Sequence, residues 1–409
     1  MLVKLGWKNL WRNKLRTGVM LAAMAFGLIG VILMIGFMNG MVNNMINNAI
    51  SWQTSHIQVH NPKQLDNPTV EDTISNSEEF LRFLSNQPDI EAYSGRFIVN
   101  GMIGTAKSSR GVQINGVNPE KEKMITPIDS GITNGEWLSD KGRNPVLISE
   151  KTAKRLRARP GSKVVITFAD SSGEVVGAAF RVKGIFKTPS TAFDDRNIYV
   201  RINDLQKLAN NTGLHEIAIR YQQEKVDGNV DYLLSRVAAL KSVTDENVLV
   251  RDWKSIQPLL ASMISTMATS NAIILGIFVL AMCLGIVNIM LMAVYERKQE
   301  FGVLMAVGMQ KNQVLTLIIF ESAWLGICGG AIGIIVSEVM MLLLGYTGLN
   351  LGSMAEGLGA YGIDTLLFPS IAYSDYIFIF TSVVFASVIA AIYPARQVLK
   401  LKPVDAMAV

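Results

Sequence analysis

The chain contains 409 residues, of which half are hydrophobic and 17% are charged, against about 25% charged residues in ordinary soluble proteins. This composition excludes an intrinsically disordered chain, a collagen-like repeat and a small disulfide-stapled scaffold. The formal net charge of +5 is compatible with a nucleic-acid partner until the charges are located along the chain.

Four long segments are apolar and nearly free of charge, which predicts four membrane-spanning helices. They cover residues 17–39, 271–295, 314–345 and 376–393. Crossing the hydrocarbon core takes about 20 helical residues, and lipid offers no partner to an open backbone, so each segment has to be helical. A signal peptide is the alternative for the first segment, but its apolar stretch is about twice the usual length and no A-x-A site follows it.

The charges in the short connections predict the orientation of the chain. Residues 1–16, 296–313 and 394–409 together carry 11 Lys and Arg against three acids, whereas residues 346–375 carry no Lys or Arg. The positive-inside rule therefore places both termini and the 295–313 loop in the cytoplasm. The basic surplus reports orientation, and we expect no nucleic-acid partner.

Apolar residues at helical spacing follow the first span and precede the second. They occupy residues 41–50 and 256–267 and predict that both helices continue beyond the membrane as stalks. Methionines are abundant around the outer mouth of the predicted bundle, at Met34, Met38, Met41, Met45, Met263 and Met267. Flexible thioethers suit variable acyl chains, so these residues are candidates for a substrate cavity, with ordinary helix packing as the alternative.

About 230 residues between the first two spans have the composition of a globular domain. Short runs rich in β-branched residues predict strands at 56–60, 112–117, 145–148, 164–168, 180–186, 198–200 and 217–221. Helical patterns cover 77–85, 151–156, 203–210 and 230–240, with Ser77, Ser149 and Asn203 as expected N-caps. The sequence therefore predicts a mixed α+β domain inserted into a membrane protein.

No segment of the sequence carries the signature of an enzyme. The P-loop pattern, G-x-S-x-G and H-E-x-x-H do not occur, so we expect no catalytic residue and no cofactor bound by this chain itself. His56 and His60 are four residues apart, but they lie on a predicted strand without a third ligand nearby, and His215 is distant, so we expect no metal site. Cys283 and Cys328 both fall within spans, where we expect apolar packing.

Two acidic residues lie inside the predicted third span. Intramembrane acids are functional candidates by default, but Glu321 and Glu338 are 17 residues apart, which is nearly five helical turns at about 3.6 residues per turn. Because a proton relay needs closer acids, we favour pairing of Glu321 with the neighbouring loop and solvent access for Glu338 at the outer end.

The same span contains two interleaved small-xxx-small pairs. These consist of Gly326, Gly329, Gly330 and Gly333. Such spacing lets helices approach closely. It predicts close packing within the subunit, and a dimer face between two subunits is the alternative.

The segment around the 295–313 loop carries the most specific pattern in the chain. It reads VYERKQEFGVLMAVGMQKNQV and resembles the coupling segment of the MacB–FtsX permease superfamily, V-x-E-R-x-x-E-[IF]-G-x-L-x-A-x-G. The matching residues are Glu296, Arg297, Glu300, Phe301, Gly302, Leu304, Ala306 and Gly308. Residues 7–17 resemble the amphipathic elbow helix of that family, with Trp7, Leu10, Trp11 and Leu15 on one side, and residues 393–407 resemble its closing element.

Within the superfamily, the large domain is most similar to lipoprotein-releasing transmembrane subunits of the LolC/LolE type. The similar segments are 56–62 (HIQVHNP), 116–120 (GVNPE), 135–138 (GEWL), 145–156 (PVLISEKTAKRL), 184–186 (GIF) and 194–200 (DDRNIYV). One connection departs from the LolC type, which carries a long chaperone-binding hook between the strands near Val164 and Phe180. Here residues 169–178 are short, which argues against capture of a carrier chaperone by this loop.

The resemblance implies the fold class and the organisation of the chain. It implies an α-helical membrane protein with four transmembrane helices and a large mixed α+β extracytoplasmic domain, MacB-like, inserted between helices 1 and 2. The expected parts are an elbow helix (1–16), transmembrane helix 1 and its stalk (17–50), the α+β domain (51–254), a stalk and transmembrane helix 2 (255–295), a coupling helix (296–313), transmembrane helix 3 (314–345), an outer loop (346–375), transmembrane helix 4 (376–393) and a cytoplasmic tail (394–409).

The resemblance also implies partners and a mechanism. The coupling helix would lie in a groove of a separate ATPase, which binds ATP and Mg²⁺, with Phe301, Leu304 and Met305 buried there and Glu296, Arg297 and Glu300 on the rim. The implied function is ATP-driven release or transport of a lipoprotein, lipid or similar amphiphile from a bacterial inner membrane. The other expected partners are a second permease copy or a related permease and a periplasmic chaperone. The alternatives are a signal relay that activates a cell-wall hydrolase and a MacB-type efflux permease.

Overall fold

The computed structural model describes residues 2–65, 68–140, 142–226, 230–245 and 248–399, and the chain forms two compact units. The helical unit comprises residues up to Val42, Met263–Asn350 and the residues from Leu366 onward. The α+β unit comprises Asn43–Ser262 and Leu351–Thr365. The part of the predicted tail beyond residue 399 lies outside the described residues.

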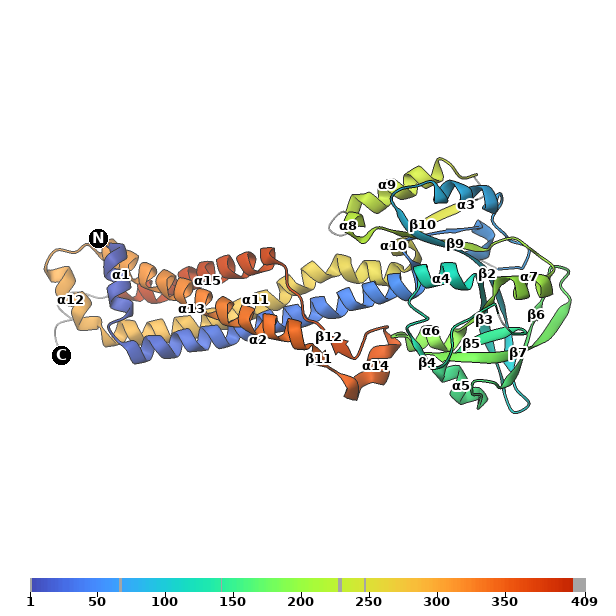
Figure 1. Ribbon diagram of the computed structural model, residues 1–409. Coiled ribbons are helices and arrows are strands. Elements are labelled where there is room, and N and C mark those ends of the chain that lie inside the picture. The colour runs from blue at the N-terminus through green and yellow to red at the C-terminus, as the bar shows by residue number, and fades with distance from the viewer. Residues whose placement is uncertain (1, 66–67, 141, 227–229, 246–247, 400–409) are drawn as a thin grey trace. The chain divides into compact units, whose positions relative to one another are not determined.

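Within the described residues, four helices are long and apolar enough to cross a membrane: Lys14–Thr54, Pro258–Glu296, Lys311–Thr347 and Tyr373–Val398. The first comprises α2 (Lys14–Ala49) and a π-helical turn, η1 (Ile50–Thr54); the others are α11 (Pro258–Glu296), α13 (Lys311–Thr347) and α15 (Tyr373–Leu399). The short helices α1 (Leu2–Leu10) and α12 (Lys298–Ala306) complete this set (Figure 1). The predicted fold class is therefore confirmed, and each span is longer than its apolar segment indicated.

The predicted elbow helix over residues 1–16 is interrupted. Helix α1 ends at Leu10, and α2 begins at Lys14, where the side chain of Asn13 accepts a hydrogen bond from the N–H of Arg16 at 3.4 Å in the manner of an N-cap. The Thr17 hydroxyl donates back to the carbonyl of Leu10. Leu10 is buried, whereas Leu15 is 81% exposed. The expectation of one continuous apolar side including Leu15 is therefore wrong.

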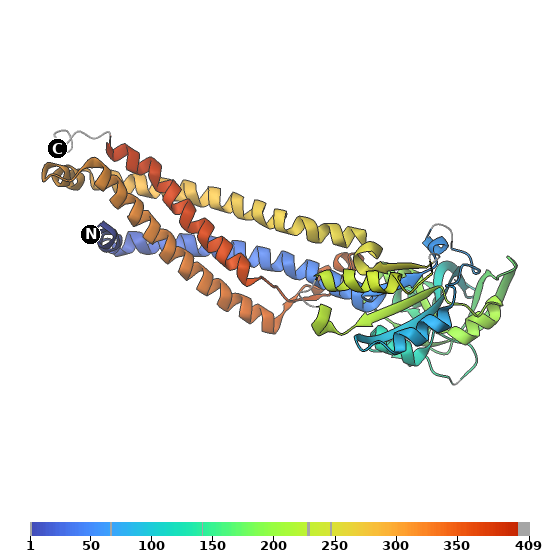
Figure 2. The same ribbon diagram turned by 90° about the horizontal axis from the view of Figure 1, so that it is seen from above.

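The four glycines of the third span face two different helices of the same subunit. Cβ atoms added at Gly326 and Gly330 would meet Ser387 and Phe380 of α15. At Gly329 and Gly333 they would meet Met24 and Leu28 of α2. The interleaved pairs therefore allow α13 to approach α15 on one side and α2 on the other, and Figure 2 shows α13 and α15 crossing closely.

One mixed sheet organises the α+β unit. Among the described residues it contains ten strands in the order β10-β1-β9-β2-β3-β8-β5-β7-β4, with β6 paired to β2 and β7. The strands are β1 (Ile57–His60), β2 (Ile90–Gly104), β3 (Ser109–Val117), β4 (Ile132–Gly135), β5 (Pro145–Ser149), β6 (Lys163–Ala169), β7 (Val175–Phe186), β8 (Asn197–Arg201), β9 (Glu216–Tyr221) and β10 (Leu249–Asp252). All seven predicted strands are present, whereas β2, β4 and β10 were not predicted.

Short helices cover this sheet. They are η2 (Pro62–Leu65), α3 (Ser77–Ser85), α4 (Pro119–Ile125), α5 (Glu150–Leu156), α6 (Thr191–Arg196), α7 (Ile202–Ala209), α8 (Gln223–Val226), α9 (Val230–Lys241) and α10 (Trp253–Ile256). Ser149 caps α5 by accepting the N–H of Thr152, as predicted. The predictions for α3 and α7 are wrong, since Asn76 and Arg201 occupy those N-cap positions without side-chain bonds.

A buried ion triad fastens the centre of the sheet. Arg96 of β2 is 5% exposed, and its guanidinium lies 2.6 Å from Glu122 of α4 and 2.5 Å from Glu216 of β9. The hydroxyl of Ser94 donates to Glu122 at 2.8 Å. Each buried charge has an opposite partner and further hydrogen bonds. These interactions offset the free-energy cost of removing the charges from water.

The predicted outer loop, residues 346–375, is largely ordered structure. Strands β11 (Leu349–Asn350) and β12 (Leu366–Leu367) form a short antiparallel ladder. Between them lie η3 (Gly352–Met354) and α14 (Ala355–Ala360). In the α+β unit, the side chain of Asn48 donates to the Gly362 carbonyl at 2.9 Å and to Asp364 at 3.1 Å. These bonds hold the 351–365 segment against the end of α2.

The contacts of the α13 glycines predict that replacing a glycine by a larger residue destabilises the protein only at the closely packed positions. Gly333→Leu should destabilise the purified full chain by about 1–3 kcal/mol, since the added Cβ would lie 2.7 Å from Leu28. Gly345→Leu on the same helix has open space around its Cβ and is the matched control. Thermal unfolding in detergent measures the difference. Equal melting temperatures for the two variants would contradict the packing.

Candidate functional site

Helix α12, the predicted coupling helix, is held by the core of the helical unit. Phe301 is 2% exposed and packs in the same cluster as Val294 of α11 and Ile318 of α13. Gly302 is also buried. Leu304 and Met305 are partly buried against this cluster. The side of α12 that carries these residues therefore attaches the helix to its own subunit.

This geometry corrects the predicted orientation of the coupling helix. Phe301, Leu304 and Met305 were expected to enter the ATPase groove, but Phe301 is buried in the permease core, and Leu304 and Met305 are partly buried against that core. The exposed apolar residues are Val303 (52%) and Val307 (84%), which are one helical turn apart, and Ala306 lies exposed beside them. We refer to Val303 and Ala306, together with Val307 at the C-cap of the helix, as the outward face of α12.

A buried ion pair ties the coupling segment to the third span. One guanidinium nitrogen of Arg297 lies 3.0 and 3.1 Å from the two carboxylate oxygens of Glu321 on α13. Arg297 and Glu321 are 8% and 6% exposed. Arg297 was expected on the rim of the contact with the ATPase, but it is buried inside the permease against Glu321. The expected pairing of Glu321 with the neighbouring loop is confirmed.

The same arginine makes two further contacts. Its Nε donates to Glu300 at 3.2 Å, and its guanidinium carbon lies 5.5 Å from the ring centroid of Phe301. Arg297 therefore links Glu300, Phe301 and Glu321 and fixes the start of α12.

Exposed ion pairs join the elbow to this segment. Arg12 pairs with Glu300, and Arg16 lies 2.9 Å from Glu296. The hydrogen bond from Arg12 lowers the pKa of Glu300, so this carboxylate stays ionised at neutral pH. Because these side chains are partly solvated, each pair contributes little alone, about 0–1 kcal/mol. Helix α1 also packs on α13, where Gly6 lies against Phe320 and the backbone of Glu321.

The end of α12 is shaped by one glycine and a capping box. Gly308 adopts φ +103°, a conformation that glycine reaches without a Cβ clash. Gln310 then begins α13, with reciprocal hydrogen bonds between its own groups and those of Gln313. The chain can therefore reverse direction directly after the outward face.

The six candidate methionines have different environments. Met34 and Met38 are 52% and 39% exposed, and Met45 is 6% exposed. The structure shows an apolar cavity of about 210 Å³ at other positions, between α2, α11 and α13. Met20, Met24, Phe278 and Met282 are among the residues that line it. Glu338 is half-buried near Tyr376 of α15.

The histidines have structural roles in the α+β unit. The Nδ1 of His56 accepts the N–H of Tyr221 at 3.0 Å, and the Nδ1 of His215 accepts the N–H of Ile98 at 2.9 Å. The Nε2 of His215 lies 3.1 Å from the carbonyl of Val70. Burial lowers the pKa of His60 and of His215. Among the described residues no cluster of His, Cys, Asp and Glu could hold a metal ion.

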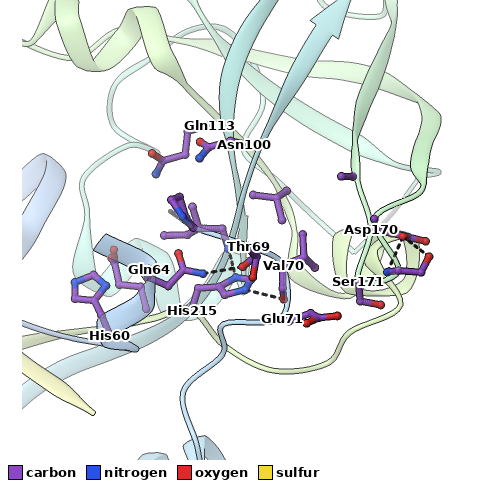
Figure 3. A pocket seen from close by; sticks show the side chains of 17 residues that line it. His60, Gln64, Thr69, Val70, Glu71, Asn100, Gln113, Asp170, Ser171 and His215 are labelled. Atoms are coloured by element: carbon purple, nitrogen blue, oxygen red, sulfur yellow. Dashed lines mark hydrogen bonds between the residues drawn. The ribbon is translucent and has the colours of Figure 1, made fainter. Parts of the chain in front are cut away.

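A polar cavity of about 570 Å³ opens beside His215 (Figure 3). Its walls come from His60, Gln64, residues 68–71, β2, β3, β9 and the β6–β7 turn. That turn is short: Ala169 pairs with Val175, and Asp170 accepts the N–H groups of Ser172 and Glu174. The connection, predicted as the short segment 169–178, is shorter still, because β6 ends at Ala169 and β7 begins at Val175.

Two neighbouring aspartates of the 194–200 segment differ in environment. Asp194 is 4% exposed and accepts the N–H of Thr188 at 3.2 Å and its hydroxyl at 2.8 Å. Burial raises the pKa of Asp194 to about 6. Asp195 lies nearer the surface and pairs with Arg110 at 2.6 Å. Asp194 therefore ties α6 to Thr188 after β7, and Asp195 ties α6 to Arg110 of β3.

Comparison with known families covers most of the chain. Residues 17–230 match the MacB-like periplasmic core domain, and residues 272–403 match the FtsX-like permease C-terminal domain. The chain belongs to the MacB–FtsX superfamily of ABC transporter permeases. An ATPase partner is expected for a permease of this kind.

Several curated proteins are similar to this MacB–FtsX permease. An uncharacterized ABC transporter permease of Methanocaldococcus jannaschii is 27% identical, with 68% of this chain and 66% of the relative covered. The uncharacterized permease YknZ of Bacillus subtilis is 25% identical, over 72% and 69%. The lipoprotein-releasing system transmembrane protein LolC of Neisseria meningitidis is 22% identical, over 83% of each. The alignments thus span about two thirds of the length of the first two relatives.

Solved structures also resemble the α+β part of this MacB–FtsX permease. The periplasmic region of MacB from Actinobacillus actinomycetemcomitans aligns with a TM-score of 0.37 at 14% identity, over 53% of this chain and 97% of that one. The extracellular domain of the transporter YknZ from Gram-positive bacteria aligns with a TM-score of 0.33 at 15% identity, over 48% and 100%.

The buried ion pair predicts strongly unequal single and double substitutions. Glu321→Met removes the buried partner of Arg297 and leaves only the exposed carboxylate of Glu300 at 3.2 Å, so it should destabilise the full chain by up to about 3–5 kcal/mol. Arg297→Met with Glu321→Met should recover most of that loss, because no charge remains buried. Thermal unfolding of the two single variants and the double variant measures the coupling energy between the two side chains. Additive losses would contradict a coupled pair.

The raised pKa of Asp194 predicts a pH dependence of stability. From about pH 4 to 6 the folded carboxyl keeps a proton that the unfolded chain releases, so stability falls as pH rises and the loss is complete above pH 6. The total is on the order of 3 kcal/mol. Asp194→Asn should remove this slope and Asp195→Asn should not. Hydrogen exchange of residues 186–201 between pH 4.5 and 7.5 measures it, and an unchanged slope in Asp194→Asn would contradict the assignment.

Proposed function

We propose that this chain is the permease subunit that receives conformational work from a separate ATPase through the outward face of α12. The observation that carries the proposal is the exposure of Val303 and Val307 on a helix whose other side is fixed in the permease core. Exposed apolar residues on a rigid, charged-rimmed helix are typical of an interface. Glu296 and Glu300, both exposed, flank this helix near its start.

The transmission path follows from the rigid contacts of α12. A push on the outward face reaches α13 through the Arg297–Glu321 pair and reaches α11 and α13 through Phe301. Because α13 is packed closely on α2 and α15 by its glycines, a displacement at α12 is passed to the whole helical unit. ATP and Mg²⁺ would be bound by the partner, with no nucleotide chemistry in this chain.

For the cargo we propose a lipoprotein, a lipid or a similar amphiphile taken from a bacterial inner membrane. The similarity to LolC over 83% of both chains supports this proposal. The apolar cavity beside Met20, Met24 and Met282 could receive acyl chains, since thioether side chains adapt to variable shapes. A periplasmic chaperone would have to dock elsewhere than on the β6–β7 turn, and a second permease, identical or related, would complete the complex.

Charge substitutions on the outward face test the ATPase interface. Val303→Asp and Val307→Asp should each abolish copurification of a P-loop ATPase, identified by mass spectrometry, and its coupled ATPase activity, because a carboxylate would be desolvated there. Val243→Asp is a matched control, since Val243 in the α+β unit is 53% exposed against 52% for Val303. A melting temperature unchanged by Val303→Asp excludes misfolding. Retention of the ATPase by both variants would contradict the proposal.

The cargo is tested by what remains bound to the purified complex. Lipidomics and proteomics of the complex, arrested in a non-hydrolysing ATPase variant, should find an acylated protein or a lipid in stoichiometric amount. A cell-wall hydrolase without an amphiphile would instead support a signal relay, and a small hydrophobic drug would support efflux.

A further inference from the structure

A polar cavity of about 540 Å³ lies between the elbow and the coupling segment of the helical unit. Its lining residues are Asn9, Arg12, Asn13, Lys14, Arg16, Glu296, Arg297 and Glu300. Four of them are basic and two are acidic. The cavity therefore has a positive excess although two carboxylates share it.

The basic groups of this cavity keep hydrogen-bonding capacity. Arg12 and Arg16 each pair with one glutamate, and a guanidinium has five N–H donors. The Nε of Arg16 is buried without a hydrogen-bond partner among the described residues, so the donors that can face the cavity are the terminal nitrogens of the guanidinium. The ion pairs found among the described residues include none with Lys14. Donors therefore remain for an anionic group in the cavity.

The surroundings of the cavity have the character of a membrane interface. Helix α1 lies across the spans on α13 (Figure 1). Its Trp7 is 40% exposed, and Trp11, directly after the helix, is 41% exposed; such half-exposed tryptophans are enriched at the headgroup level. The next residues of α2, Leu15 and Val19, are 81% and 62% exposed. Polar donors thus lie directly beside an apolar helix surface that suits acyl chains.

We propose that this cavity binds the phosphate headgroup of an anionic phospholipid, whose acyl chains lie along Leu15 and Val19. The free donors of Arg16 and the ammonium of Lys14 would hold the phosphate. Glu296 and Glu300 oppose an anion, but they are already neutralised by Arg16 and Arg12. A bound headgroup would connect the elbow with the coupling segment, so anionic lipid would stiffen the part of the permease that meets the ATPase.

Native mass spectrometry of the full chain tests the site. The purified protein is titrated with phosphatidylglycerol, with phosphatidylcholine of the same acyl chains, and with inorganic phosphate. We expect phosphatidylglycerol to bind preferentially, and Lys14→Gln and Arg16→Gln each to weaken it about fivefold, as expected for one interfacial charge. Lys14→Gln breaks no ion pair of the described residues. Lys8→Gln removes the same charge from α1 at an exposed position outside the cavity and should leave the affinity unchanged.

Three outcomes would overturn the proposal. Equal binding of the two phospholipids, or equal losses for Lys8→Gln and Lys14→Gln, would show diffuse attraction without a site. Competition by inorganic phosphate at the concentration of the lipid would show a free-anion site. Displacement of phosphatidylglycerol by the ATPase, with a loss of ATPase binding in Lys14→Gln, would show that the cavity belongs to the protein interface.

Discussion

The arrangement of the coupling segment depends on the buried pair between Arg297 and Glu321. A carboxylate on a membrane-spanning helix is tolerated where an opposite charge and hydrogen bonds accompany it, and Arg297 supplies both at 3.0 and 3.1 Å. The pair fixes the point at which the chain passes from α11 to α12, and it fixes the orientation of α12 about its own axis. In this orientation Phe301 is buried in the core, and the opposite side of α12 is exposed.

This orientation of α12 explains why the motif contains both charged and apolar positions. The motif residues Arg297, Phe301 and Gly302 serve attachment to the subunit itself. Val303 and Val307 follow them at unspecified positions of the motif, and both side chains are exposed. A helix that is fixed on one side and exposed on the other can transmit force, because a displacement of the partner moves the core with it and is not absorbed by a flexible loop.

Hydrophobic periodicity predicted much of this structure. It failed for elements whose position or orientation depends on contacts between residues far apart in the sequence. The spans and seven strands were predicted because length and alternation are local properties. Strand β2 was missed because Gly95, Arg96, Gly101 and Gly104 interrupt its alternation; Arg96 is buried only because Glu122 and Glu216 meet it. The orientation of α12 was predicted wrongly because both of its sides are apolar, and sequence alone does not tell which side the core covers.

Site-directed thiol labelling tests the orientation of α12 most directly. In a background with Cys283 and Cys328 replaced by Ala, single cysteines at Val303, Val307 and Phe301 are treated with a membrane-impermeant maleimide on the purified permease, with and without its ATPase. We predict rapid labelling at positions 303 and 307, protection of both by the ATPase, and no labelling at 301 in either state. Labelling at 301 that the ATPase blocks, with 303 and 307 unaffected, would contradict the account.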